Sequence, residues 1–203
     1  MSAINRGFLG FPKPKLSFFE PLAVKVARGA VVDLQFGRAD FDWTAYEEIE
    51  FRFVNLLPAT AGGVYWQAQI SQDGGATFSS SANYGSLITK SIASPAVAAF
   101  TSTTTAWNLI GDPATTLTAQ SNQLNYGLNG KLVATRPWET FNKMWHAPGI
   151  SYFDANAVTA FCTFAGAFTA NGNPISGIRF FYNTGNIAQG AIYAFGFRRA
   201  ANL

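Results

Sequence analysis

Short runs that alternate between apolar and polar residues constrain this chain most. In Glu48–Val54, isoleucine and phenylalanine occupy every second position, with Glu or Arg between them. This period of two places one face of a strand against a core and the other in water. No helical period is sustained over residues 79–130, and the rest of the chain shows almost no helical pattern. Further strand-like runs are Val31–Phe36, Val64–Ile70, Lys131–Thr135, Val158–Phe168, Gly177–Tyr182 and Gly190–Arg199.

Turn-forming residues separate these runs. Asp73-Gly74-Gly75 offers glycines for positive φ, and Thr77-Phe78 starts a predicted return strand, so a hairpin is expected here. Lys131–Thr135 and Trp138–Trp145 are predicted to form another hairpin, and Asn183–Asn186 is a turn by composition. Many short strands with almost no helical pattern predict an all-β fold, an antiparallel β-sandwich of jelly-roll-like type.

The predicted organisation is an arm followed by one domain. Residues 1–30 are expected to form an extended arm, because prolines interrupt them and forbid a continuous helix. Residues 31–203 are expected to form a single β-sandwich domain with a loop-rich segment at 79–130, whose charges are Lys90 and Asp112 alone. The arm has no core of its own, so its phenylalanines need another surface, on this chain or a neighbouring one. They are Phe8, Phe11, Phe18 and Phe19, alternating with Pro12, Pro14 and Pro21.

Composition narrows the class of protein further. Charged residues make up only 12% of the 203 residues, about half the usual share of roughly 25%. A surface this poor in charge usually contacts another copy or a partner. The net charge of +3 comes with no Lys/Arg stripe, so no nucleic-acid partner is predicted. No apolar run of about 18 residues appears, so no membrane insertion is predicted. Residues 1–10 lack a secretory signal, so folding in a cytoplasm is expected.

Three segments resemble a group of phage and prophage virion proteins. Members of that group often carry a strand ending in NLLPAT, an S-x-DGG-x-TF hairpin and a final SGNIASGT-x-x-LYG hairpin. Here the matching segments are Glu48–Thr60, Gln69–Phe78 and Ile175–Gly190, the last followed by Tyr193–Gly196. Phe195 stands where the group often has Tyr, which keeps the ring and loses the hydroxyl. The resemblance covers about half of the chain, and residues 1–30 and 85–130 lie outside it.

The resemblance implies a role in a phage particle. Proteins of this group are usually labelled tail, tail-fibre or structural proteins, and the group has no catalytic residues to carry over. The implied function is a non-enzymatic tail or fibre protein of the virion that assembles with itself, as a homotrimer, and with other virion proteins. A capsid decoration or head-fibre protein is the alternative placement. Truncation of residues 1–30 is expected to leave the sandwich folded and to abolish incorporation into particles.

Catalytic groups are scarce in the sequence. His146 is the single histidine, so a Ser-His-Asp triad or a Cys-His dyad would have to use it. Cys162 is the single cysteine and lies in a strand-like run, where a buried inert thiol is expected. Neither a zinc site nor an intrachain disulfide is compatible with these counts. No cofactor is predicted.

The acidic residues between positions 40 and 50 leave one route to an enzyme. Two carboxylates about 5–9 Å apart in a cleft would make a polysaccharide-degrading site. The segment lacks the density of acidic residues that a known calcium loop shows, so solvated side chains are the leading interpretation, ahead of calcium binding and catalysis. The residues are Asp40, Asp42, Glu47, Glu48 and Glu50.

Aromatic residues offer a glycan-binding alternative. Exposed rings on a β-sandwich can stack on sugars, although tryptophan is heavily buried on average. The candidates for contact with a host-surface glycan are Tyr84 and Trp107, because both border the uncharged loop-rich segment. Core packing or subunit contact is nevertheless the leading interpretation for all five rings, which are those of Trp66, Trp107, Trp138, Trp145 and Tyr84.

Overall fold

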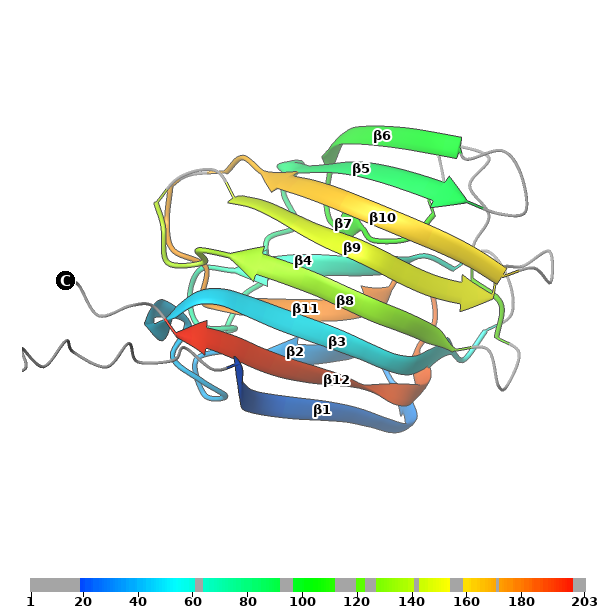
Figure 1. Ribbon diagram of the computed structural model, residues 1–203, viewed down its shortest axis with the longest axis horizontal. Helices are drawn as coiled ribbons and strands as arrows, with labels where there is room; N and C mark the ends of the chain where they lie inside the picture. The colour runs from blue at the N-terminus through cyan, green and yellow to red at the C-terminus, as the bar shows by residue number, and fades with distance from the viewer. Residues whose placement is uncertain are drawn as a thin grey trace, which may run out of the picture.

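A computed structural model gives the fold of the chain. It describes residues 19–60, 64–91, 97–111, 120–122, 127–140, 143–153, 159–170 and 172–198. Over these ranges the chain forms two antiparallel sheets that pack face to face, so the predicted all-β sandwich is confirmed (Figure 1). A one-turn 3-10 helix, η1 (Trp43–Ala45), is capped by the Asp42 side chain, which accepts a hydrogen bond from the Thr44 amide at 2.9 Å.

The larger sheet has eight strands in the described ranges, and the smaller has four. The order in the larger sheet is β1 (Phe19–Val31), β12 (Ile187–Arg198), β3 (Tyr46–Pro58), β8 (Leu128–Thr135), β9 (Lys143–Phe153), β10 (Thr159–Phe168), β5 (Tyr84–Ser91) and β6 (Val97–Thr104). The order in the smaller sheet is β2 (Asp33–Phe36), β11 (Gly177–Tyr182), β4 (Trp66–Ser71) and β7 (Trp107–Asn108).

The strand pairing is that of a jelly roll with two inserted hairpins. β1 pairs with β12, β2 with β11, β3 with β8 and β4 with β7, as in one long antiparallel ribbon rolled into two sheets. The β5–β6 hairpin is inserted between β4 and β7, and the β9–β10 hairpin between β8 and β11. The two insertions pair with each other through β10 and β5 and extend the larger sheet beyond β8.

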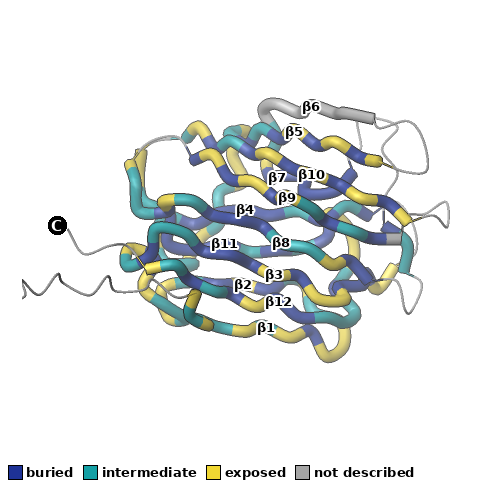
Figure 2. The backbone as a smooth tube through the Cα atoms, in the orientation of Figure 1, coloured by how far each residue is buried: buried dark blue, intermediate teal, exposed yellow. Residues whose placement is uncertain are grey.

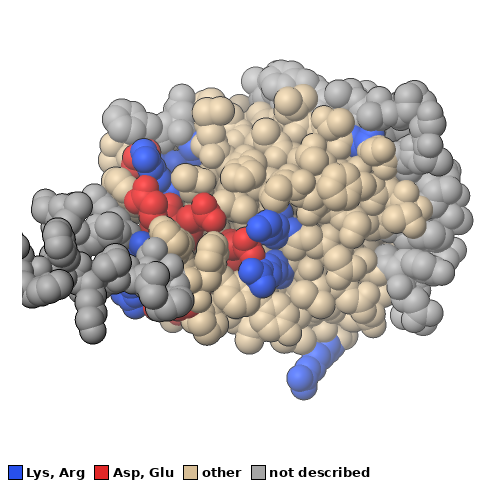
Figure 3. All heavy atoms as spheres, in the orientation of Figure 1, with Lys and Arg blue, Asp and Glu red and all other residues tan. Residues whose placement is uncertain are grey.

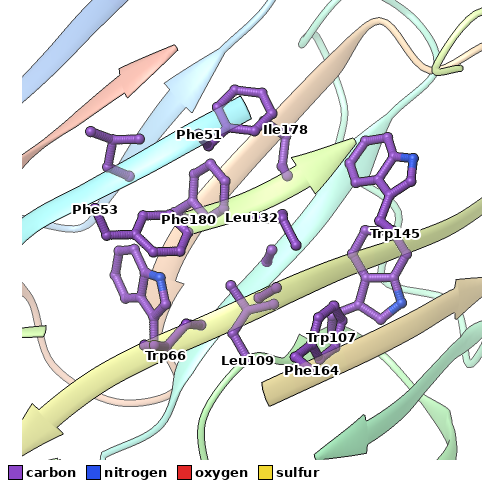
Figure 4. Packing of buried hydrophobic residues seen from close by; sticks show 14 of the residues in the cluster. Phe51, Phe53, Trp66, Trp107, Leu109, Leu132, Trp145, Phe164, Ile178 and Phe180 are labelled. Atoms are coloured by element: carbon purple, nitrogen blue, oxygen red, sulfur yellow. The ribbon is translucent and has the colours of Figure 1, made fainter. Parts of the chain in front are cut away.

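The core lies between the sheets and continues under the inserted hairpins. On β3, Ile49, Phe51 and Phe53 point inward with at most 2% of their surface exposed, as their alternation predicts. The rings of Phe51 and Phe53 meet Trp66 and Phe180 of the smaller sheet in an aromatic cluster (Figure 4). Under the extension, the rings of Tyr84, Trp107, Trp145, Phe164 and Phe168 form a second cluster.

The segment around Asp73 crosses between the sheets, so the predicted hairpin is wrong. β4 belongs to the smaller sheet, Thr77 and Phe78 are not in a strand, and the next strand, β5, belongs to the larger sheet. Gly74 and Gly75 do adopt positive φ, at 84° and 97°. The Asn183–Asn186 turn likewise leads from β11 to β12 in the other sheet, whereas β8 and β9 pair directly, as predicted.

Hydrogen bonds to Asp73 hold the first of these corners. Its carboxylate accepts bonds from the Ser71 hydroxyl at 2.6 Å, the Thr77 amide at 2.9 Å and the Thr77 hydroxyl at 2.6 Å. The Gly74 amide donates to the Ser176 hydroxyl at 2.8 Å, which ties the corner to the start of β11. The hydrogen bonds to the Asp73 carboxylate lower its pKa well below its ordinary value, and the bond from the Ser71 hydroxyl has the largest effect.

The depressed pKa of Asp73 makes its contribution to stability depend on pH. A carboxyl whose pKa is lower in the folded state stabilises the fold above its unfolded pKa, about 3.9, and loses this effect as the pH falls. We therefore expect Asp73→Asn to lower the free energy of unfolding at pH 7 and to differ less from the wild type at pH 3. Urea titrations of both proteins at the two pH values measure this; a gap of equal size at both would contradict it.

Residues 19–30 of the predicted N-terminal arm belong to the sheet instead. Residues 19–31 form β1, a strand at the edge of the larger sheet that pairs with β12 from Phe19 with Phe197 onward. Pro21 fits there because an edge strand has one side without ladder bonds, and the register shifts between Pro21 and Ala23. Residues 1–18 lie outside the described residues, so truncation at residue 30 would remove a strand, and a test of the arm must stop at residue 18.

Candidate interaction surface

The outer face of the larger sheet exposes a set of large apolar side chains. Each lies at an outward position of its strand and has between 40% and 77% of its surface exposed. Figure 2 shows the resulting alternation of exposed and buried positions along these strands. Contiguous apolar patches on monomers are small, and larger ones mark contact sites. The residues are Val24, Val26, Val54, Leu87, Met144, Phe161 and Tyr193.

A groove of about 640 Å³ runs along the end of β10 on this face. Its floor consists of small residues, Ala165 and Ala167 on β10 and Gly85 on β5. Leu87 of β5 forms one wall, and Met144 and His146 of β9 form the other. The groove exists because β10 places small side chains between taller ones on both neighbouring strands. Asn83 and Thr169 add polar groups among its lining residues.

Charged side chains gather toward one end of the same face, while the surface over β9 and β10 is almost wholly uncharged (Figure 3). Glu50 is 3% exposed and binds Arg52 and, at 2.7 Å, Lys131. Burial opposes the ionised form of Glu50, but the hydrogen bonds from Lys131 and Arg52 prevail and lower its pKa. The Arg52 guanidinium also lies 4.5 Å from the centre of the Phe195 ring.

Three of the other acidic residues of the 40–50 segment also have structural partners, whereas Glu48 has no ion-pair partner among the described residues. Asp40 binds the Lys25 ammonium at 2.5 Å and accepts the Gly37 amide at 2.9 Å, and Glu47 pairs with Arg136 at 2.7 Å. Asp42 caps η1. Within the described ranges, no group of three or more His, Cys, Asp or Glu side chains is arranged to hold a metal ion.

His146 and Cys162 lie on opposite faces of the larger sheet. His146 is exposed in the wall of the groove, and none of the described residues hydrogen-bonds to its ring. Cys162 is completely buried, and its thiol lies 3.7 Å from the Tyr152 hydroxyl. Burial raises the pKa of the Cys162 thiol, so the expected buried inert thiol agrees with this environment. The fold does not bring these two residues together.

The glycan-contact prediction for Tyr84 and Trp107 is wrong. Both side chains have no exposed surface, and their rings pack edge to face at 5.4 Å. The Trp107 indole donates to the Ala167 carbonyl at 2.8 Å, and the Tyr84 hydroxyl donates to the Ser79 carbonyl at 3.0 Å. Burial raises the pKa of Tyr84 to about 12. Neither ring has a face free for a sugar, whereas the expected core role of Trp66 and Trp145 is confirmed by their burial.

Of the phenylalanines predicted as a virion anchor, Phe8, Phe11 and Phe18 lie outside the described residues. Phe19 begins β1, has 43% of its surface exposed and packs against Phe197 at 5.9 Å between ring centres. Phe19 is therefore an outward residue of the sheet's edge strand.

Two charged residues with unusual environments in the fold could not be identified from the sequence. Arg179, on the smaller sheet, donates to the Gln69 side chain at 2.8 Å and lies 5.1 Å from each of the rings of Phe78 and Phe181. Lys143 is 4% exposed, and its ammonium has no hydrogen-bond partner among the described residues. Burial lowers the pKa of Lys143. No local pattern marks these residues, because their environments come from strands distant in sequence.

The chain matches no family model, no curated protein and no solved structure. No helix in the described part of the chain is long and apolar enough to cross a membrane.

Proposed function

We propose that this protein is a non-enzymatic structural component of a bacteriophage virion, a tail or fibre protein that assembles with itself. The observation that carries the assembly part is the apolar outer face of the larger sheet, whose exposed side chains span β1, β12, β3, β9, β10 and β5. The resemblance of Glu48–Thr60, Gln69–Phe78 and Ile175–Gly190 to phage virion proteins supports the virion part.

The physical chemistry of the face favours a protein partner. Non-obligate interfaces are depleted of charge at their centre and enriched in aromatic residues and methionine. Phe161 and Met144 have this character. The charged residues Glu50, Arg52 and Lys131 lie on β3 and β8, in the middle of the sheet, so the charge-depleted centre of such an interface would lie over β9, β10 and β5. The proposed assembly is a homotrimer that contacts other virion proteins. The proposed localisation is the particle, assembled in the host cytoplasm.

Substitution of Met144 by glutamate tests the assembly surface. With 77% of its surface exposed, Met144 contributes little to folding, so Met144→Glu is expected to leave thermal unfolding unchanged and to convert the trimer to monomer. Light scattering after size exclusion measures the mass. The matched control is Val32→Glu, because Val32 is 70% exposed but lies between β1 and β2, away from the face. A wild-type monomer, or equal effects of both variants, would refute assembly through this face.

Copy number in purified particles decides the placement. Quantitative mass spectrometry relative to the major capsid protein is expected to give a few to some tens of copies for a tail, collar or vertex fibre. Copies comparable to the capsid protein would indicate the alternative, a capsid decoration protein. Absence from particles would refute the virion assignment, and glycan binding or polysaccharide degradation would then be tested directly on the purified chain, with Asp40→Asn and Glu50→Gln as the variants for degradation.

A further inference from the structure

The groove on β5, β9 and β10 requires an apolar occupant of limited size. The floor of the groove is open because it consists of small residues, Ala165, Ala167 and Gly85. Its two sides are formed by the apolar side chains of Leu87 and Met144. Among the described residues, no Lys, Arg, Asp or Glu lines the groove. A groove of about 640 Å³ suits a few bulky side chains of an extended segment rather than a second folded surface.

The distance across the sheet from β1, the first described strand, to the groove can be estimated from the strand pairing. One row of paired residues crosses the larger sheet from β1 to the groove. The row is Pro21, Phe195, Glu50, Val133, His146, Ala165 and Leu87. Neighbouring strands are about 4.8 Å apart, so Leu87 lies about 29 Å from Pro21 across the sheet. β1 begins two residues before Pro21, at the same end of the sheet as the end of β10 and the start of β5 (Figure 1), and these two strand ends line the groove.

The sequence before β1 contains an apolar cluster at the matching separation. Phe8-Leu9-Gly10-Phe11 precedes Phe19 by 8 to 11 residues. An extended chain advances about 3.3 Å per residue, so this cluster can reach about 26–36 Å from Phe19. Pro12 and Pro14 exclude a helix, which would shorten this reach by half. The reach of the cluster therefore brackets the distance to the groove.

Basic residues of the segment can also reach an acidic residue of the sheet. Lys13 and Lys15 precede Phe19 by six and four residues, which corresponds to a reach of about 13–20 Å. Glu48 lies two strands from β1, about 10 Å away, because it pairs with Phe197, which pairs with Phe19. Glu48 projects from the outer face between β1 and the groove and has no ion-pair partner among the described residues.

We propose that the groove binds Phe8–Phe11 of the same chain, with Lys13 and Lys15 crossing the acidic residues of β3 on the way. Attachment to β1 gives the segment an effective concentration in the millimolar range at its own groove, which favours this site over a second copy. The proposal does not depend on the virion assignment, since it uses only the groove, the row of paired strands and the segment. In the proposed assembly, the bound segment would lie within the interface, between Leu87 and Met144.

Disulfide trapping in the full-length chain tests the occupant. Leu9→Cys combined with Leu87→Cys is expected to form an intrachain disulfide in mild oxidant, seen as loss of two thiols at monomer mass. The native Cys162 is completely buried and does not compete. The control pairs Leu9→Cys with Val54→Cys, because Val54 is 44% exposed against 45% for Leu87 and lies on the same face, about 25 Å from Phe19.

A segment without a binding site would reach Val54 at least as readily as Leu87. Faster bonding to Leu87→Cys supports the proposal, and equal or faster bonding to Val54→Cys overturns it. A disulfide-linked dimer of the Leu87 variant would also overturn it, by assigning the groove to the segment of a second copy.

Proteolysis gives a second readout without cysteines. Trypsin cleavage after Lys15 is expected to accelerate about tenfold in Ala165→Asp, since burying one phenylalanine is worth at least one decade in a binding constant. Thr163→Asp is the matched control, because Thr163 is also exposed on β10, on the same face, but does not line the groove. Equal rates in the wild type and both variants would overturn the proposal.

Discussion

Replacing Phe180 by alanine is expected to lower the free energy of unfolding by about 3–5 kcal/mol, the usual cost of removing a buried phenylalanine ring. Phe180 has no exposed surface and lies at the centre of the contacts between the sheets (Figure 4). Its ring is stacked on Trp66 at 5.9 Å and meets Phe51 and Phe53 at 5.4 and 5.2 Å. Residues of both sheets surround the ring, so the cavity left by its removal cannot collapse without moving a sheet.

The neighbouring residue supplies the control for this prediction. Phe181 points to the outer side of the smaller sheet, where its ring lies 5.1 Å from the Arg179 guanidinium. Phe181→Ala should cost about 1 kcal/mol or less, the range of an exposed cation–π contact. Urea titration followed by circular dichroism measures both changes. Losses of equal size would contradict the assignment of opposite faces to adjacent residues of β11.

Strands could be predicted from the sequence where one face of the strand is buried and the other faces outward, because this alone sets the alternation of apolar and polar residues. On β10 the burial alternates from Thr159 to Phe168, because one side packs on the core and the other faces outward. On β3 the same alternation is visible in the sequence of Glu48–Val54. A strand that buries one face must place apolar residues at every second position, so the period can be recognised without knowing which strands are its neighbours.

The partner of a strand could not be predicted in the same way. The turn residues at Asp73–Gly75 and Asn183–Asn186 indicate that the chain reverses, but the reversal in both places leads into the other sheet. At the first corner the outcome depends on distant residues. The Gly74 carbonyl accepts the Arg38 amide at 3.1 Å, and the Gly74 amide donates to Ser176. These long-range bonds leave no mark in the local sequence.

The candidate surface was missed for a related reason. Prediction of glycan contacts relied on large aromatic residues near a polar, loop-rich segment, and Tyr84 and Trp107 met that description. In the fold, the insertion of β5 and β6 brings this segment onto the extended part of the larger sheet, whose inner face it covers. The groove forms because the side chains of Ala165 and Ala167 are small. Small residues in a strand predict a groove only when the neighbouring larger residues, here Leu87 and Met144, are known.

Trp107→Ala is expected to destabilise the inserted hairpins by about 3–5 kcal/mol, since the indole is fully buried beneath them. Its ring centre lies 5.4 Å from Tyr84, 5.2 Å from Trp145 and 6.1 Å from Phe164, residues of β5, β9 and β10. The Trp107 side chain, on β7, contacts all three of these strands. Its removal should therefore lower the free energy of local unfolding of the inserted hairpins more than that of the jelly roll. Hydrogen exchange followed by mass spectrometry should show faster exchange in β5, β9 and β10 than in β11 or β2.

The Trp107→Phe variant separates packing from hydrogen bonding. Phenylalanine keeps a ring in the cluster but cannot donate to the Ala167 carbonyl, so a smaller loss is expected, including about 1 kcal/mol for the missing bond. The Ala167 carbonyl belongs to β10, beneath the groove, so both variants should also loosen the groove floor. Uniform acceleration of exchange across both sheets in Trp107→Ala would mean that the extension and the jelly roll unfold as one cooperative unit. Unchanged exchange in the extension would mean that Trp107 does not hold it, despite its burial.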